Sequence, residues 1–288
     1  MTAVSNLTWR LREMSDLEYR RFAAYVHDVS GIALNDSKRA LVARRLHARM
    51  RELGTQTLAE YTDYVQSDES GVETVRLLDL IATNETHFFR ERPHWEFLET
   101  RVFPAWVADA AAGRRDRSVR AWSAACSTGQ EPYSLAMHLL DLLPPSDGWT
   151  HEIHASDIST HALDRARHAE WPIEKAAEIP SGYLQRYMLR GIGNHVGVMC
   201  AGRDLREMVT FSRVNLKDAT YAVPGQFDLI FCRNVLIYFT AEGRADVIER
   251  LTSRLAPGGL LFVGHAESLH AHRDRLRPVL PTVYARAA

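Results

Sequence analysis

The chain has 288 residues, of which 46% are hydrophobic and 25% are charged, and this balance excludes a disordered or fibrous protein. The length favours two domains, because one domain commonly takes about 100–200 residues. The formal net charge of −1 provides no bulk attraction to nucleic acid, so we expect no nucleic-acid partner. No apolar run reaches the roughly 18 residues of a membrane-spanning helix, and we expect no direct membrane insertion.

Several absences favour a cytoplasmic location. Residues 1–6 contain no basic segment followed by an apolar core, so no secretion signal is predicted. The three cysteines, Cys126, Cys200 and Cys232, are odd in number and widely spaced, which favours reduced thiols over a disulfide framework or a zinc site. The thirteen histidines show no metal-ligand spacing, and we therefore predict no bound metal.

Residues 1–82 are predicted to form an all-α N-terminal domain of four short helices. Two of these helices begin at a capping box, at residues 15–18 (SDLE) and 70–73 (SGVE). Gly31 and Gly54 are expected to end the first and second helices. The predicted ranges are 15–31, 35–54, 57–67 and 70–83.

The second of these helices, residues 36–53, is basic. Residues 1–54 hold ten Lys and Arg against six acidic residues, and this basic front on an acidic body suggests an acidic partner. A solvated helix face is the alternative explanation. One face carries apolar residues at helical spacing, namely Val42, Leu46, Met50 and Leu53. The cations expected away from that face are Lys38, Arg44, Arg45, His47 and Arg51.

Residues 118–288 show short apolar strands that alternate with helices, which predicts βαβ units and a parallel sheet. The segment 183–212 interrupts this alternation with glycines among aromatic and β-branched residues, and it predicts a small antiparallel insertion. Residues 83–117 are expected to hold an interdomain linker and a helix. The predicted strands include 119–122, 153–155 and 227–231, and the predicted helices include 131–142, 159–169 and 241–255.

The expected carboxyl edge of the sheet carries features of a nucleotide site. The loop at 123–132 consists mainly of small residues and leads into a helix start, where free N–H groups favour an anionic group. Asp157 ends the next strand, where Rossmann-like sheets bind ribose hydroxyls. An ordinary turn and a surface aspartate explain these two features about equally well. The Pro-Gly-Gly turn at 257–259 resembles a late turn of S-adenosylmethionine-dependent methyltransferases, and the lack of G-x-G-x-x-G argues against NAD.

Four segments narrow the interpretation because they occur together in one order. They are TNETHFFR at 83–90, AACSTGQEPYS at 124–134, ASDI at 155–158 and FCRNVLIYF at 231–239. This set resembles the CheR family of chemotaxis-receptor glutamate O-methyltransferases, and the resemblance covers nearly the whole chain. It implies an α/β, Rossmann-like methyltransferase domain after an all-α domain. It also implies methyl transfer from S-adenosylmethionine to glutamate side chains, with S-adenosylhomocysteine as the product.

The resemblance also implies roles for individual residues. Arg90 and Tyr238 are expected to be catalytic, because a guanidinium matches two carboxylate oxygens and the tyrosine can orient the substrate or close the methyl pocket. A surface salt bridge and a core aromatic are the alternative roles for these two side chains. Gln130 stands where the family often has a second glutamate. The residues expected to bind the cofactor are Asn84, Thr86, Arg90, Glu131, Asp157, Asn215, Leu216, Arg233 and Asn234.

Two contacts with a chemoreceptor follow from the same resemblance. The loop from Gly191 to Gly197 resembles a hairpin that binds a receptor C-terminal tail by adding a strand. On the basic helix, the residues expected to bind the receptor's cytoplasmic helices are Lys38, Arg44, Arg45 and Arg51. Two alternatives stay open: a methyltransferase of the same fold that acts on another protein or a small molecule, and a non-catalytic module that senses S-adenosylmethionine or binds DNA.

Overall fold

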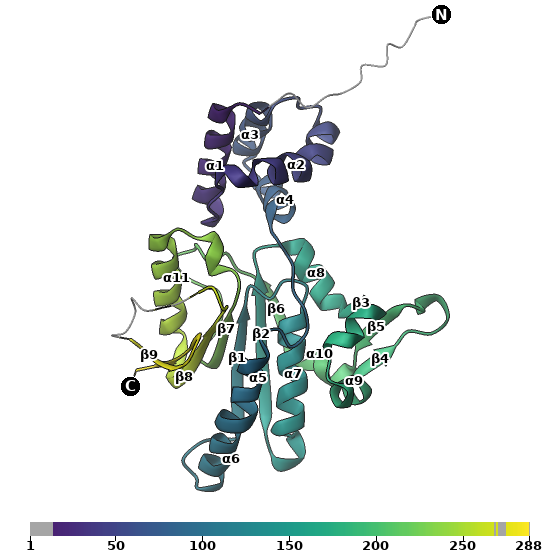
Figure 1. Cartoon of the computed structure of the whole chain (residues 1–288), viewed down its shortest axis with the longest axis vertical. Coiled ribbons are helices and arrows are strands. Elements are labelled where there is room, and N and C mark those ends of the chain that lie inside the picture. The colour runs from purple at the N-terminus through teal and green to yellow at the C-terminus, as the bar shows by residue number, and fades with distance from the viewer. Residues whose placement is uncertain (1–13, 268, 270–274, 288) are drawn as a thin grey trace, which may run out of the picture. The chain divides into compact units, whose positions relative to one another are not determined.

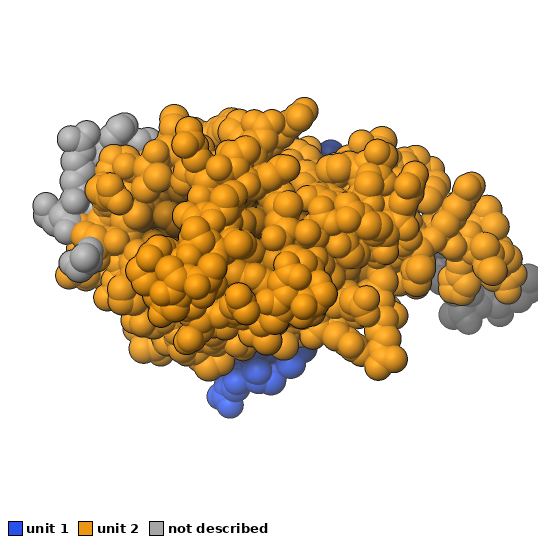
Figure 2. All heavy atoms as spheres, turned by 90° about the horizontal axis from the view of Figure 1, so that it is seen from below, with its two compact units in different colours: residues 1–83, 238–240 blue, residues 84–237, 241–288 orange. Residues whose placement is uncertain are grey.

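The computed structural model describes residues 14–267, 269 and 275–287. Residues 1–6, for which no secretion signal is predicted, lie outside the described part. The chain forms two compact units, which Figure 2 colours separately. Among the described residues, no helix is long and apolar enough to cross a lipid bilayer. The first unit contains residues 1–83 and 238–240, and the second contains residues 84–237 and 241–288. The segment 84–117, predicted as a linker and helix, therefore belongs to the second unit.

The first unit is helical, as predicted. Ser15 and Glu18 form the expected capping box, and Gly31 and Gly54 end two helices in the left-handed conformation, with φ of 75° and 74°. The apolar face of the second helix is buried at three of its four predicted positions, while Leu53 is partly buried. The elements are α1 (Asp16–Ser30), η1 (Asp36–Lys38), α2 (Arg39–Leu53), α3 (Leu58–Ser67) and α4 (Val72–Ile81).

The start of α4 differs from the predicted capping box at 70–73. Instead, a carboxylate oxygen of Asp68 accepts the N–H of Glu73 at 2.7 Å. The Glu73 side chain is buried and bonds to Arg49 Nε at 3.0 Å and to the Tyr61 hydroxyl at 3.0 Å. A buried carboxylate needs a charged partner, so the tertiary ion pair takes the side chain that a local cap would use.

The second unit is built on a seven-stranded sheet in the order β6-β2-β1-β7-β8-β10-β9 (Figure 1). The first five strands are parallel, and β10 is antiparallel to both its neighbours. The connections from β1 and β7 run in opposite directions, so these two strands form the switch point at which open α/β sheets bind ligands. The strands are β1 (Ser118–Ala124), β2 (Thr150–Asp157), β6 (Val209–Arg213), β7 (Phe227–Cys232), β8 (Leu255–Val263), β9 (Leu276–Leu280) and β10 (Val283–Arg286).

Helices complete the Rossmann-like arrangement that the sequence predicts. Because crossovers between parallel strands are right-handed, α7 and α11 cover opposite faces of the sheet. Aromatic residues fill the core, where Phe231 and Phe262 stack with ring centres 4.4 Å apart. The main helices are α5 (Arg92–Phe97), α6 (Phe103–Ala111), α7 (Gln130–Leu142), α8 (Thr160–His168), α9 (Ser181–Tyr187), α10 (Arg203–Met208) and α11 (Ala241–Ser253), and a π-helical turn, η2 (Leu98–Val102), joins α5 to α6.

A second, three-stranded antiparallel sheet confirms the small insertion, but its limits differ from 183–212. It contains β3 (Glu170–Pro172), β4 (Met188–Arg190) and β5 (Val198–Ala201), in the order β3-β5-β4. β3 lies before the predicted range, and three residues are too few to show a strand pattern. β6 begins within that range but pairs in parallel with β2 of the main sheet. As an edge strand with mixed burial, it shows no continuous apolar run.

The Pro-Gly-Gly segment at 257–259 lies within β8 rather than before it. The register between β7 and β8 shifts here, from Phe227 opposite Leu255 to Leu229 opposite Leu260. Gly258 has a φ of 74°. The predicted turn is therefore an irregularity inside the strand, and the apolar residues after it are buried as expected.

Candidate active site

The loop between β1 and α7 is held against the end of β2. The N–H groups of Ala125 and Cys126 both donate to the Ser156 carbonyl at 2.8 Å. One carboxylate oxygen of Asp157 accepts the N–H of Ser127 at 2.8 Å. The other accepts the N–H of Ser159, the residue before α8, at 2.9 Å. Asp157, predicted to bind ribose, thus braces the loop that leads into α7.

The backbone of this loop is unusual. Ala125, Ser127 and Gly129 have φ values of 74°, 51° and 95°, and two of these residues are not glycine. Left-handed non-glycine residues carry strain that is often found at functional sites. A Cβ on Gly129 would lie 3.1 Å from Ala166 and 3.3 Å from Tyr133. The glycine is therefore required by close packing on α8 as well as by its φ.

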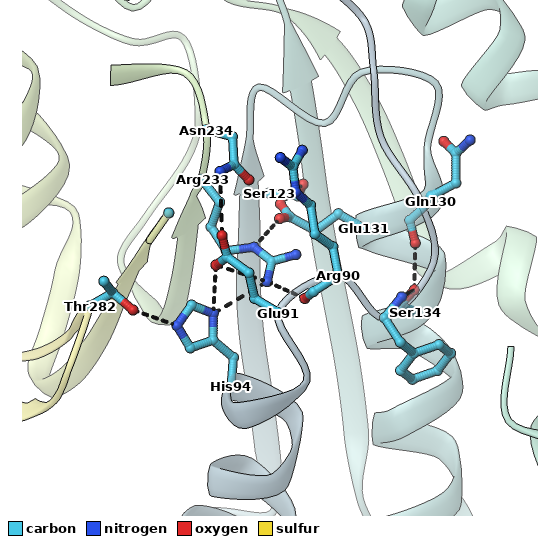
Figure 3. A network of polar contacts seen from close by, with 12 residues as sticks. Arg90, Glu91, His94, Ser123, Gln130, Glu131, Ser134, Arg233, Asn234 and Thr282 are labelled. Carbon is cyan, nitrogen blue, oxygen red and sulfur yellow. Dashed lines mark hydrogen bonds and ion pairs between the residues drawn. The ribbon is translucent and has the colours of Figure 1, made fainter. Parts of the chain in front are cut away.

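Two predicted cofactor residues, Glu131 and Arg233, contact each other at the switch point (Figure 3). Glu131 lies in the first turn of α7, and Arg233 follows β7 directly. The Arg233 Nε donates to Glu131 Oε2 at 2.7 Å, and the Ser123 hydroxyl donates to Oε1 at 2.6 Å. The side chains of Arg233 and Glu131 are 2% and 10% exposed. The pair joins two of the sequence motifs through charge-assisted hydrogen bonds.

Arg233 also holds the segment that carries Arg90. Its Nη1 donates to the Arg90 carbonyl at 2.6 Å, to His94 Nδ1 at 3.2 Å, and lies 3.7 Å from Glu91 Oε2. The Trp95 ring nitrogen donates to the same Arg90 carbonyl at 2.9 Å. Burial, with the nearby Arg233 charge, lowers the pKa of His94 from 6.5 to about 4. His94 is therefore neutral near pH 7.

Lowering the pH from 6.5 to 5 is expected to weaken the fold through His94. The unfolded chain takes up the imidazole proton below about pH 6.5, whereas the folded chain does so only near pH 4. Each pH unit in this interval removes about 1.4 kcal/mol of unfolding free energy, or roughly 2 kcal/mol in all. Denaturant unfolding at pH 6.5 and pH 5 measures this change. Between the two pH values His94→Asn should lose about 2 kcal/mol less unfolding free energy than the unaltered protein. An equal pH dependence in the two proteins would contradict a neutral His94.

The segment 84–90 carries three predicted site residues. The Asn84 carbonyl accepts the Ser127 hydroxyl at 3.0 Å, which links the segment to the β1–α7 loop. Thr86 and Arg90 are both partly buried. The Arg90 guanidinium donates a long hydrogen bond, of 3.4 Å, to the Glu85 carbonyl. The main chain at Arg90 is thus firmly held, while its side chain makes only a weak internal contact.

Asn234 follows Arg233 in a left-handed conformation, with a φ of 60°. Its side chain donates to Glu91 Oε1 at 3.3 Å, and its N–H donates to Glu267 at 2.9 Å. Glu267 is fully buried and also accepts the N–H of Gly264 at 2.7 Å. Burial raises the pKa of Glu267, and these main-chain donors oppose the shift. This glutamate therefore joins the loops that follow β7 and β8.

Asn215 and Leu216, predicted to line an adenine pocket, follow β6 at the same carboxyl edge of the sheet. Asn215 Oδ1 accepts the N–H of Lys217 at 3.0 Å. Leu216 is buried, and its carbonyl accepts the Tyr221 hydroxyl at 2.9 Å and Arg250 Nη2 at 3.1 Å. Arg250 of α11 thus helps to hold this loop in place. The contact of Asn215 and Leu216 with adenine stays a prediction.

Tyr238 belongs to the first unit with residues 239 and 240. Its carbonyl accepts the N–H of Ala33 at 2.7 Å. The Tyr238 side chain is partly exposed, whereas the neighbouring Phe239 is buried. Phe239 is therefore the core aromatic of this pair, whereas Tyr238 is only partly buried. The catalytic role of Tyr238 stays a prediction.

The predicted receptor-binding cations, Lys38 in η1 and the others in α2, differ in exposure. Lys38, Arg44 and Arg51 are exposed, as expected. Arg45 is partly buried, and its guanidinium donates to the carbonyls of Ile81 and, at 2.9 Å, Ala82. A cation at a helix C-terminus is stabilised by the free carbonyls and the helix dipole, so Arg45 caps α4 rather than joining the exposed face.

Sequence reasoning missed three acidic or imidazole side chains of this site: Glu91, His94 and Glu267. Glu91 follows the Arg90 motif directly, and Glu267 stands just beyond a buried strand, so position alone could have suggested both.

The buried carboxylates of Glu91, Glu131 and Asp157 outnumber the buried guanidinium of Arg233. This excess of negative charge is complementary to the positively charged sulfonium and ammonium groups of S-adenosylmethionine.

Comparisons with known proteins agree with this arrangement. The family model described as "CheR methyltransferase, SAM binding domain" matches residues 84–285, and "CheR methyltransferase, all-alpha domain" matches residues 17–82. A "Chemotaxis protein methyltransferase" of Salmonella typhimurium is 39% identical over 263 residues, covering 91% of this chain and 87% of that protein. The Escherichia coli (strain K12) protein of the same name is 39% identical over 273 residues, covering 94% and 91%. "Chemotaxis protein methyltransferase 2" of Pseudomonas aeruginosa is 37% identical over 272 residues, covering 94% and 93%. The chain therefore belongs to the CheR methyltransferase family, with its S-adenosylmethionine-binding domain at residues 84–285.

Proposed function

We propose that this protein methylates glutamate side chains on the cytoplasmic domains of chemoreceptors, giving glutamyl methyl esters for chemotactic adaptation. The observation that carries the proposal is the contact of Glu131 with Arg233. It brings two motifs together at the switch point of the sheet, beside the main chain of Arg90. The names of the relatives, chemotaxis protein methyltransferases, support the chemotactic substrate.

The reaction requires little acid–base chemistry from the protein. When bound, S-adenosylmethionine supplies a methyl group on a positively charged sulfur. A glutamate carboxylate has a reference pKa of about 4.3, so near pH 7 it is already ionised and no catalytic base is required. The remaining task is to align the two reactants, which can lower a barrier by about 7–11 kcal/mol.

Three side chains would divide this task. Arg90 would bind the substrate carboxylate, because its guanidinium has few internal partners and matches two oxygens. Glu131, fixed by Ser123 and Arg233, would bind the methionine part of the cofactor. Tyr238 would orient the substrate oxygen or close the space around the methyl group.

One assay tests the proposal. Purified receptor cytoplasmic fragment is incubated with the protein and tritiated S-adenosylmethionine, and base-labile volatile methanol is counted. Label released from the receptor fragment supports the proposal. Label found only on a small molecule favours the related methyltransferase, and tight cofactor binding without any label favours a non-catalytic sensor.

We further propose that the exposed cations of α2 bind the acidic receptor helices. The variant Arg44→Glu/Arg51→Glu is expected to lower receptor methylation about tenfold or more at low salt, because attraction becomes repulsion. The deficit should shrink at high salt, where exposed charges are screened. The check is the KM for receptor fragment across a salt series.

The matched control makes the same charge change elsewhere on the first unit. Arg20 on α1 and Arg76 on α4 are both exposed. Arg20→Glu/Arg76→Glu should leave methylation and its salt dependence near those of the unaltered protein. If the α2 variant behaved like this control, α2 would not be the receptor-binding surface.

The loop from Gly191 to Gly197 supports a second receptor contact. β4 is an edge strand of the small sheet, and Leu189, Ile192 and Val196 beside it are 58%, 81% and 74% exposed. A cavity of about 280 Å³ lies against the same strand. We propose that a receptor tail adds to this edge, and calorimetry with tail peptides should detect heat of binding. If the tail peptides gave no heat of binding and did not compete with the receptor, the proposed tail contact would be wrong.

A further inference from the structure

A buried histidine, His94, contacts Arg233 of the Glu131–Arg233 pair (Figure 3). His94 is 1% exposed, and its two ring nitrogens have different partners. Nε2 lies 2.8 Å from Thr282 Oγ1, and the Thr282 hydroxyl donates its own hydrogen to the Pro281 carbonyl at 2.6 Å. Nε2 must therefore carry the ring hydrogen, so Nδ1 accepts from Arg233 at 3.2 Å.

Two of the three guanidinium nitrogens of Arg233 are bound to groups of the protein. Its Nε is bound to Glu131, and its Nη1 is bound to the Arg90 carbonyl and to His94. Its central carbon lies 5.6 Å from the centre of the Trp95 ring, and the side chain is 2% exposed. Arg233 therefore fixes the groups that it holds, the Glu131 carboxylate and the main chain at Arg90.

Glu91 completes the surroundings of this guanidinium. It has a φ of 61°, and its Oε2 lies 3.3 Å from His94 Nδ1 and 3.7 Å from Arg233 Nη1. This oxygen is buried without a hydrogen bond, while Oε1 accepts the N–H of His265 at 3.1 Å. Two acceptors, Glu91 Oε2 and His94 Nδ1, thus lie close to the same nitrogen of Arg233, on the side away from Glu131.

We propose that His94 is a positioning residue for methyl transfer. Its neutral ring orients Arg233, and Arg233 in turn fixes the Glu131 carboxylate and the main chain at Arg90. The inference rests on the proposed function, but it concerns His94, a side chain that is 1% exposed and is not among the residues expected to bind cofactor or substrate. A displacement of about 1 Å in such a support can lower a rate about 100-fold.

Two substitutions separate the roles of the two ring nitrogens. In His94→Asn the amide oxygen can occupy the place of Nδ1 and accept from Arg233, whereas in His94→Gln the amide reaches the place of Nε2 and leaves Arg233 without that acceptor. We expect His94→Gln to lower kcat about 30- to 100-fold and to weaken S-adenosylhomocysteine binding about tenfold. His94→Asn should stay within about fivefold of the unaltered protein in both measurements. Receptor methylation gives kcat, calorimetry gives the Kd, and thermal melting compares stability.

The outcomes are distinct. The inference would be overturned if both variants lost activity and S-adenosylhomocysteine affinity equally and in proportion to their decrease in Tm. Such a result would mean that His94 has only a structural role. If the unaltered protein forms no methyl ester, the proposed function fails, but S-adenosylhomocysteine affinity still decides between the two variants. The matched control is His154→Gln, which removes another buried imidazole, one that bonds to Ser212 at 2.9 Å. This control should leave kcat and the Kd unchanged within about twofold.

Discussion

Replacing Arg233 with methionine is expected to lower the free energy of unfolding by about 3–5 kcal/mol, because it leaves buried carboxylates without their cation. Glu131 and Glu91 lie 2.7 Å and 3.7 Å from the guanidinium, and their side chains are 10% and 7% exposed. Neither carboxylate can turn to bulk water. Denaturant unfolding at pH 7 measures the change.

A second substitution should reverse part of this loss. Arg233→Met/Glu131→Gln removes one of the two uncompensated charges, and we expect it to recover about 2 kcal/mol. As a control, Arg275→Met breaks the exposed pair of Arg275 with Glu249 and should change stability by about 0.5 kcal/mol or less. Similar losses for Arg233→Met and Arg275→Met would mean that the buried network contributes no more than a surface ion pair.

Replacing Arg90 with alanine is expected to lower methyl transfer about 10²- to 10³-fold with little change in stability. The expected loss is that of one charge-assisted contact to the reacting carboxylate. Stability should persist because the hydrogen bonds from Trp95 and Arg233 go to the carbonyl of residue 90, which alanine keeps. Single-turnover methylation and thermal melting together test both halves of this expectation.

Two further substitutions calibrate the Arg90 result. Arg90→Lys keeps the charge but loses the planar fork, and its rate should fall between those of Arg90→Ala and the unaltered protein. Arg92→Ala removes a neighbouring guanidinium that is 86% exposed and should leave the rate unchanged. If Arg90→Ala kept more than a third of the original rate, Arg90 would not bind the reacting carboxylate.

The sequence predicts those parts of the fold that have a strong local pattern. The helices of the first unit carry caps and glycine ends, and β1, β2 and β7 each end in a run of buried residues. β3 and β4 have only three residues each, so their pairing with β5 leaves little trace in the sequence. The capping box predicted at 70–73 failed for a related reason: the buried partner of Glu73 is Arg49, 24 positions away.

The site shows the same division. Glu131, Arg233 and Asn234 belong to motifs that are recognised in order along the chain, and the structure brings the first two into contact. His94 is a single residue within a helix, and its partners Arg233 and Thr282 lie 139 and 188 positions away. No spacing rule links residues at such separations, so only the folded chain reveals this network.

Residues 238–240 make the first unit discontinuous in the sequence. The chain leaves the first unit after residue 83, returns to it at Tyr238 and departs again at residue 241. A gene truncated after residue 83 would encode helices α1–α4 without the carbonyl that accepts the N–H of Ala33. One protease cut near residue 83 would leave the helices and residues 238–240 on separate fragments, held together only by non-covalent contacts such as this hydrogen bond. Recombination at a single joint therefore cannot exchange the helical unit between relatives as an intact module.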